Sequence, residues 1–333
     1  MVFVSASGAA AMLGVSRFTS PGAPSPIPAL PDVVAIVYEG PTSASFHAAL
    51  RAAPLGSAGG RSGAWRLGPW LQSWTEGEHA VAVGSVREAI ARGDVYQVNL
   101  VGHASASYQG DPTPALRRIT ELPGARYPYL LAGDGWALAC ASPETLVRVV
   151  GRRVETLPIK GTRPATAAGR AELISSAKER AEHIMIVDLE RNDLAHVART
   201  GSVDVPDLFV VRRWCDLWQA ESRVVAELAD GVDLAALLRA VCPGGSVTGA
   251  PKVAALAQIA ALEPVGRGPS MGALGWLDHE TLELGLTIRT VAVDADRVHL
   301  WAGGGITWDS DPEAEVAEAA AKAAPLRAAL AGP

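Results

Sequence analysis

Cysteine is scarce in this chain of 333 residues, and the three present, Cys140, Cys215 and Cys242, lack the spacing of metal ligands. An odd, widely separated set is typical of reduced, buried cysteines in a cytosolic protein. Charge of one sign is not in large excess either, because 29 Lys and Arg face 35 Asp and Glu, a net charge of −6. That balance, without a basic cluster, argues against nucleic acid as a partner.

Long apolar runs are also missing. No uncharged stretch is long enough to cross a bilayer, and residues 1–13 lack the positive start of a signal peptide. Hydrophobic residues nevertheless make up 49% of the chain, enough for a large core. We therefore expect a globular, cytoplasmic protein with no nucleic-acid and no membrane partner.

Two common catalytic patterns are absent. The segment 243–252 (PGGSVTGAPK) is rich in glycine and ends where a helix is expected, but it lacks the GK[ST] ending of a phosphate-binding loop. No Ser-His-Asp arrangement stands out, and no cysteine lies in a nucleophile elbow. We therefore expect no glutaminase site within this chain.

Strand-like and helix-like segments follow one another along most of the chain. Apolar patterns predict strands near 33–38, 95–100, 127–132, 136–141, 144–150, 153–159, 207–213, 220–228, 271–277, 282–293 and 297–303. Helical spacing predicts helices at 85–92, 171–198, 234–241, 251–262 and from residue 310 onward. Runs of strands with helices set between them predict an α+β fold with large antiparallel sheets.

Lys160 has an unusual setting for a lysine. It follows a short apolar run and precedes Gly161, and Arg163 lies close by in the segment 158–164 (PIKGTRP). A glycine lets a ligand approach the backbone, and a neighbouring cation favours a neutral, nucleophilic amine. A surface lysine in a strand-to-loop turn is the commoner interpretation of such a heptapeptide standing alone.

Four glutamates stand where a carboxyl group could do chemistry. Glu315 and Glu318 lie three apart and share one face of the C-terminal helix, and Glu182 lies within the long helix. Oxygen ligands from two helices suit Mg²⁺, whereas glutamates that only complement the helix dipole are the alternative. Glu144 begins a strand beside apolar residues, where burial would raise its pKa towards that of a general acid, unless it is an exposed turn residue.

Arg289 lies within a strand-like segment, 286–290 (LTIRT), where an inward-facing arginine needs an anionic partner. A substrate carboxylate and a structural salt bridge would serve equally well. The turn 302–305 (AGGG) follows a strand and could offer backbone N–H groups to a carboxylate, although a plain tight turn is the commoner case.

Seven segments, in this order, resemble a known family. They are GDVYQVNL (93–100), SPETL (142–146), PIKGTRP (158–164), KERAEHIMIVDLERNDL (178–194), PGGSVTGAPK (243–252), LTIRT (286–290) and AGGGITWDSDPEAEVAE (302–318). Together they make roughly residues 80–330 similar to the chorismate-utilising enzymes, and most similar to component I of aminodeoxychorismate synthases. The resemblance implies two large antiparallel β-sheets packed as a sandwich with helices outside. Residues 1–75 would be a short N-terminal region that adds strands to this fold, and 76–333 the chorismate-binding catalytic domain.

The resemblance also implies roles for individual residues. Lys160 would attack C2 of chorismate while Glu144 protonates the departing C4 hydroxyl, and ammonia would then add at C4 to give 4-amino-4-deoxychorismate, a precursor of p-aminobenzoate and folate. A magnesium ion would be held by Glu182, Glu315 and Glu318. Substrate contacts would come from Gly161, Thr162, Arg289, Gly303, Gly305, Gln97 and Trp276.

Two positions point to this reaction within the family. Relatives that add water carry a lysine in place of Gln97, and a glutamine has no basic nitrogen with which to activate water. Lys160 stands where anthranilate synthases usually have alanine. Gln219 and Trp276 stand where family members commonly have histidine and tyrosine, which changes the fine substrate contacts.

A separate glutaminase (glutamine amidotransferase) subunit is the ammonia source that the resemblance implies.

Two alternatives to the aminodeoxychorismate synthase activity stay open. One is an anthranilate synthase component I, which would aminate C2 and release pyruvate. The other is a non-catalytic chorismate-binding subunit.

Overall fold

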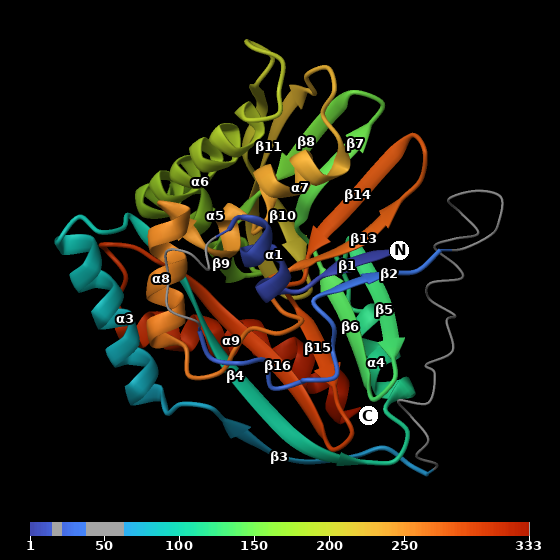
Figure 1. The fold of residues 1–333 in the computed structure, drawn as a ribbon. Coiled ribbons are helices and arrows are strands. Elements are labelled where there is room, and N and C mark those ends of the chain that lie inside the picture. The colour runs from blue at the N-terminus through green and yellow to red at the C-terminus, as the bar shows by residue number, and fades with distance from the viewer. Residues whose placement is uncertain (15–21, 38–62, 333) are drawn as a thin grey trace.

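The computed structural model describes residues 1–14, 22–37 and 63–332 of the chain. In this part the strands form two antiparallel sheets (Figure 1). The nine-stranded sheet has the order β10 (Asp204–Trp214), β11 (Leu217–Glu227), β8 (Arg153–Leu157), β7 (Thr145–Val150), β14 (Thr281–Leu286), β13 (Ala273–Leu277), β1 (Val2–Val4) and β2 (Val33–Ala35), with β9 (Ile159–Pro164) paired to β11. The seven-stranded sheet has the order β12 (Gly249–Ala250), β4 (Gln97–Gln109), β16 (Arg297–Ile306), β15 (Thr290–Val293), β6 (Trp136–Ser142) and β5 (Tyr127–Gly133), with β3 (Arg66–Gln72) paired to β4.

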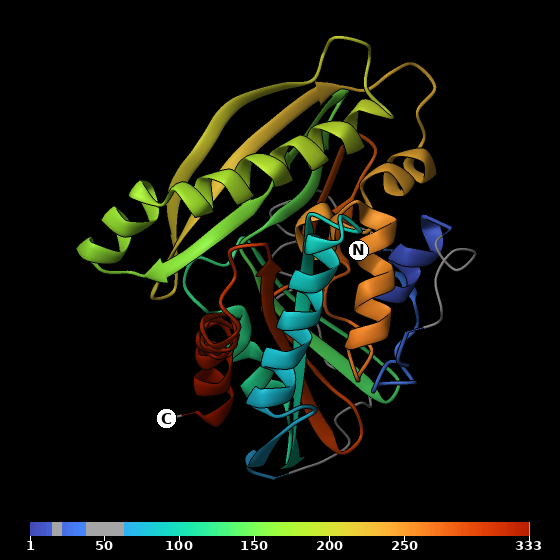
Figure 2. The same ribbon diagram turned by 90° about the vertical axis from the view of Figure 1, so that its left-hand side faces the viewer.

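Helices lie around the outside of these sheets (Figure 2). In the described residues they are α1 (Ala6–Met12), α3 (Glu76–Ala91), α4 (Thr113–Thr120), α5 (Ala167–Ser175), α6 (Ala177–Ala195), α7 (Leu234–Val241), α8 (Lys252–Leu262) and α9 (Pro312–Ala331), and a 3₁₀ turn lies at Gly245–Val247. Helix α6 packs on β11, and α9 packs on β16. This arrangement confirms the predicted α+β fold. Among the helices described, none combines the length and apolar surface that crossing a membrane requires.

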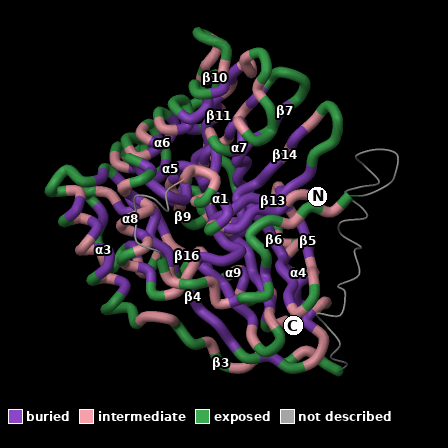
Figure 3. Tube along the Cα trace, viewed as in Figure 1, coloured by how far each residue is buried: buried purple, intermediate pink, exposed green. Residues whose placement is uncertain are grey.

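The hydrophobic core draws side chains from both sheets. Phe3 and Leu274 of the larger sheet and Tyr127 and Leu138 of the smaller one belong to one buried cluster. Figure 3 shows the strands buried along most of their length and the outer helix surfaces exposed. Burying one such side chain stabilises the fold by about 1.5–3 kcal/mol. The three cysteines are buried and form no disulfide, as predicted.

The single helix predicted over 171–198 is two helices. Ser176 has an extended backbone, with φ −70° and ψ 109°, and ends α5 there. Its hydroxyl accepts a hydrogen bond from the Glu179 backbone N–H at 3.2 Å and so caps α6. Serine side chains compete with the helical hydrogen bonds in this way, so the helix breaks at Ser176. The apolar spacing continues across the break and therefore did not reveal it.

The strand predicted over 282–293 is also divided. Arg289 has φ 51°, in the left-handed region, and separates β14 of one sheet from β15 of the other.

The strand predicted over 33–38 forms over Val33–Ala35, and Tyr38 lies outside the described residues. Helix α3 (Glu76–Ala91) starts earlier than the predicted residue 85. Thr75 is its N-cap and forms a capping box with Glu78 in the first turn.

Candidate active site

A cavity of about 90 Å³ lies where residues of both sheets meet helices α6 and α9. Ten of the twelve residues predicted for the site line it: Glu144, Lys160, Gly161, Thr162, Glu182, Arg289, Gly303, Gly305, Glu315 and Glu318. Segments that are far apart in the sequence are thus brought to one place. The two predicted residues outside this lining are Gln97 and Trp276.

Lys160 of β9 is buried, with 8% of its surface exposed. Its Nζ donates a hydrogen bond to the Ser246 carbonyl at 3.0 Å and lies 3.8 Å from the Glu182 carboxylate. The residue is therefore not the surface lysine of the alternative interpretation. The cation expected beside it is balanced, because Arg163 pairs with Glu172 at 2.6 Å and with Glu179 at 2.9 Å.

Glu144 is buried next to this amine. Its Oε1 accepts a hydrogen bond from the Ile159 backbone N–H at 3.1 Å, and its side chain also bonds to the Ser246 hydroxyl. Burial raises the pKa of Glu144, and the charge of Lys160 acts in the opposite direction. A carboxyl group held in this way can keep a proton to give to a leaving oxygen. The carbonyl of Ser246 faces Lys160 and its hydroxyl faces Glu144, so this residue joins the two.

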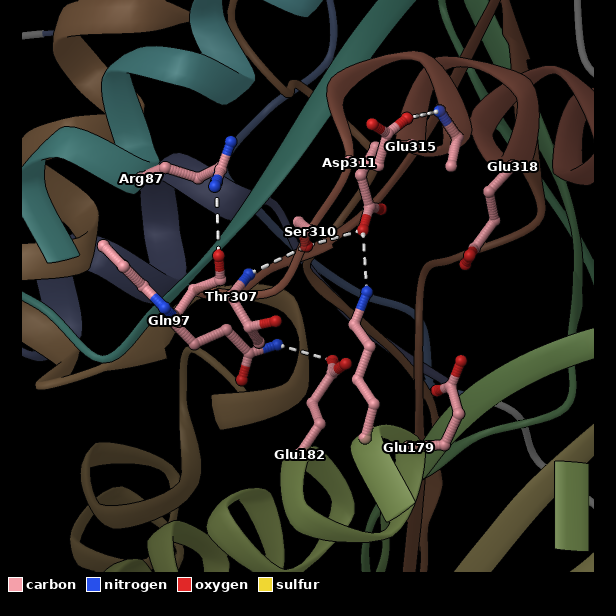
Figure 4. Close-up of polar contacts among 12 residues, drawn as sticks. Arg87, Gln97, Glu179, Glu182, Thr307, Ser310, Asp311, Glu315 and Glu318 are labelled. Atoms are coloured by element: carbon pink, nitrogen blue, oxygen red, sulfur yellow. Dashed lines mark hydrogen bonds and ion pairs between the residues drawn. The ribbon is translucent and has the colours of Figure 1, made fainter. Parts of the chain in front are cut away.

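Four carboxylates face the cavity from two helices. Figure 4 shows Glu179 and Glu182 extending from α6 towards the side where Glu315 and Glu318 descend from α9. Burial raises the pKa of Glu182 to about 7, an effect that Lys160 opposes and the other three carboxylates reinforce. Burial also raises the pKa of Glu315.

Lysines compensate this negative charge. Lys322 lies 2.6 Å from Glu318, and Lys178 lies 3.9 Å from Glu315. Burial alone would raise the pKa of Glu318, but Lys322, with smaller effects of Arg163 and Arg289, outweighs burial and the pKa is lowered. Each acidic group therefore has a cation at hand from the chain itself.

The glycines of β16 leave room for these side chains. A Cβ on Gly305 would lie 1.9 Å from the Gln97 Nε2 and 2.6 Å from the Glu182 Oε1. Those two atoms are joined by a hydrogen bond of 2.9 Å, which Figure 4 also shows. Gln97 thus lies outside the cavity lining but holds the carboxylate of a residue that belongs to it.

The four carboxylates of Glu179, Glu182, Glu315 and Glu318 form an acidic cluster, and their donor chemistry fits Mg²⁺. The carboxylates supply hard oxygen ligands from two helices, and burial leaves them with unfavourable mutual repulsion that a dication would relieve. In the described part of the chain no three acidic, histidine or cysteine side chains are already arranged around one point that could hold an ion.

Arg289 is buried, with 7% of its surface exposed. Among the described residues, no carboxylate lies within 4.0 Å of its guanidinium, so it does not form the structural salt bridge of the alternative interpretation. Burial lowers the pKa of Arg289 to about 10. The side chain lines the cavity as a cation whose hydrogen-bond donors can reach a ligand.

Trp276 is placed differently from the prediction. It lies in β13 and packs into the hydrophobic core, away from the cavity lining. Both faces of this central strand are buried, so an aromatic residue there serves packing.

Further residues of the cavity were missed by the sequence analysis. They include Asn99, Lys178, Glu179, Ser246 and Lys322, while Gln219 was noted only as a departure from the family pattern. Spacing could have indicated two of them, because Glu179 precedes Glu182 by three residues and Lys322 follows Glu318 by four. Nothing in the local sequence singles out the others.

Comparison with known proteins gives consistent matches. The profile of the chorismate binding enzyme family matches residues 46–328. Aminodeoxychorismate synthase component 1 of Bacillus subtilis is 37% identical over 270 residues, covering 79% of this chain and 57% of the relative. Anthranilate synthase component 1 of Streptomyces coelicolor is 40% identical over 257 residues, covering 75% of this chain and 50% of the relative. The chain thus spans about half the length of these curated relatives.

Solved structures share the fold. The crystal structure of anthranilate synthase component I from Streptococcus pneumoniae has a TM-score of 0.79 and 26% sequence identity, over 98% of this chain and 80% of that one. A putative 2,3-dihydroxybenzoate-specific isochorismate synthase from Bacillus anthracis has a TM-score of 0.72 and 28% identity, over 80% of this chain and 74% of that one.

Proposed function

Since this chain belongs to the chorismate binding enzyme family, we propose that it is component I of an aminodeoxychorismate synthase, which converts chorismate and ammonia into 4-amino-4-deoxychorismate. The observation that carries the proposal is the buried amine of Lys160, which shares one cavity with Glu144 and the acidic cluster. An amine in that place can act as a nucleophile, and the neighbouring carboxyl group can act as an acid.

Two residues would perform the bond changes. The Lys160 lone pair forms a bond to C2, both ring double bonds shift by one position, and the C4–oxygen bond breaks. Glu144 gives its proton to that oxygen, which leaves as water. Ammonia then bonds to C4, both double bonds shift back, and the electron pair of the C2–nitrogen bond returns to Lys160. The surplus proton on the new amino group passes to Glu144, which restores both side chains.

The acidic cluster would hold magnesium through Glu182, Glu315 and Glu318. When bound, the ion would neutralise the ring carboxylate of chorismate and withdraw electron density from the ring. The chain's own contribution is to gather these carboxylates, and Gln97 orients Glu182 by its hydrogen bond. Calorimetric titration with Mg²⁺ tests this assignment. Glu318→Gln should weaken magnesium binding at least tenfold, and unchanged affinity would contradict it.

Anthranilate synthase component I is the second candidate, because relatives with that activity in their names are similar to the same degree. It would aminate C2 directly and eliminate pyruvate. A lysine side chain facing the cavity favours the first proposal, because it can occupy C2 and leave C4 to ammonia.

Product identification separates these candidates. The purified chain should convert chorismate, Mg²⁺ and ammonium into a product with the mass of aminodeoxychorismate. Lys160→Ala should lower the rate by at least about a thousandfold, as expected for a lost nucleophile. Lys178→Ala, which removes a lysine from the same cavity without removing the reacting amine, should cost far less. Fluorescent anthranilate in place of the expected product would refute the proposal in favour of the second candidate.

The ammonia would come from a separate glutaminase subunit. Glutamine should therefore replace ammonium only when an amidotransferase subunit is added. Glutamine-dependent turnover by the chain alone would contradict this part of the proposal.

A further inference from the structure

Two arginines are buried among the described residues, and Arg289 differs from the other, Arg267, which forms an ion pair. Arg267 has the same exposed fraction, 7%, but its guanidinium is bound by the Glu263 carboxylate at 2.6 Å and by two backbone carbonyls. The guanidinium carbon of Arg289 instead lies 4.6 Å from the centre of the Trp214 ring. The carboxylates of Glu318 and Glu144 act on Arg289 only from greater distance.

Trp214 is itself firmly held. It ends β10 with 1% of its surface exposed, and its indole Nε1 donates a hydrogen bond to the Ala141 carbonyl at 3.0 Å. The backbone N–H of Ala141 donates to the Arg289 carbonyl at 3.1 Å. One residue of β6 therefore fixes both the aromatic ring and the backbone of the arginine that lies over it.

The choice of an aromatic partner has a chemical consequence. A buried cation needs compensation, and a carboxylate would provide it at the expense of the guanidinium's charge and N–H groups. The face of an indole ring attracts the cation without accepting hydrogen bonds in the guanidinium plane. In the described part of the chain the buried Nε of Arg289 has no hydrogen-bond partner, which agrees with a donor group left for a ligand.

We propose that Trp214 is a positioning residue for substrate binding. It keeps Arg289 buried, oriented and free of a protein carboxylate, so that the guanidinium can bind a carboxylate group of the substrate. The identity of that substrate as chorismate rests on the proposed function. Trp214 touches Arg289 and not the reacting atoms, so its effect falls on affinity.

Three variants test this role. Trp214→Leu removes the aromatic face, and Trp214→Phe keeps a smaller face but loses the bond to Ala141. Trp70→Leu is the matched control, because Trp70 lies under Arg327 at 5.2 Å outside the cavity lining. Chorismate affinity is measured by calorimetry in the Lys160→Ala background, where turnover does not interfere. In the chain with Lys160 intact, KM and kcat are measured, together with the melting temperature.

Trp214→Leu should raise the dissociation constant and KM about 10-fold to 30-fold while kcat falls less than threefold, since a desolvated cation–π contact has that weight. Trp214→Phe should recover most of the affinity, and Trp70→Leu should leave it unchanged. If Trp214→Leu binds chorismate as tightly as its parent, the inference is wrong. Should Trp214→Leu fail to fold, Trp214→Phe decides: a folded Phe variant with the full affinity of its parent would overturn the role of the ring, because that variant has a smaller face and lacks the bond to Ala141. Parent protein that binds chorismate without converting it would instead refute the proposed function alone.

Discussion

Replacing Gly305 by alanine should remove most of the activity and leave the fold intact. The added Cβ would lie 1.9 Å from the Gln97 Nε2 and 2.6 Å from the Glu182 Oε1, so both side chains must move. The shift displaces the Glu182 carboxylate, and a misplacement of about 1 Å in an active site can cost on the order of 100-fold in rate. We therefore expect kcat/KM to fall about 10-fold to 150-fold.

Stability should change little, because the atoms that must give way are the ends of two side chains. Gly303→Ala is the informative contrast. Its Cβ would lie 1.9 Å from the Leu100 carbonyl oxygen, and backbone in the β4–β16 ladder cannot move without breaking hydrogen bonds. That variant should lose about 1–3 kcal/mol of stability or more, as expected for severe overpacking.

Two measurements on each variant distinguish these outcomes. Steady-state chorismate consumption gives kcat/KM, and thermal unfolding gives the melting temperature. Gly305→Ala is expected to melt within about 2 °C of the parent, close to the shift of a change below 1 kcal/mol in a chain of this size. A Gly305→Ala variant with parental kcat/KM would show that the Gln97–Glu182 contact does not support the reaction.

Three further outcomes are expected. Glu144→Gln should lower kcat about 100-fold to 10,000-fold with little change in KM, because it removes the proton donor but keeps the shape, and a kcat within tenfold of the parent would contradict that role. Lys252→Met should destabilise the fold by about 3–5 kcal/mol in urea unfolding, because Lys252 pairs with buried Asp193 at 2.7 Å, and adding Asp193→Asn should restore part of the loss. Burial raises the pKa of Glu190 to about 8, above its value in the unfolded chain, so the native state binds the extra proton and the parent loses stability as pH rises from about 4.5 to 8. Glu190→Gln cannot ionise, so the melting temperature of this variant minus that of the parent should increase from pH 5 to pH 8. A difference that stays constant over this range would refute the assignment.

Local patterns predicted the fold class and most of the elements. Apolar alternation and helical spacing depend on burial of one face, and this protein buries those faces as the patterns imply. The patterns do not show where one element ends inside a continuous apolar run. Ser176 divides a helix through a side-chain cap, and Arg289 turns the chain from one sheet into the other.

The site was predictable where motifs bring several chemical groups together, as at Lys160, Glu144 and the three glutamates. It was not predictable where only the tertiary fold decides the direction of a side chain. Trp276 lies in a strand buried on both faces, so the sequence could not tell the core from the cavity. Ser246 contributes its carbonyl oxygen, a group that every residue carries.

The pairing of Arg163 with Glu172 of α5 and Glu179 of α6 joins the strand that carries Lys160 to both helices across the Ser176 break. Glu182 lies one turn beyond Glu179 on the same helix, so a single arginine links the two sides of the cavity. If a ligand bound by the glutamates shifted α6, the ion pairs of Arg163 would transmit part of that shift to β9.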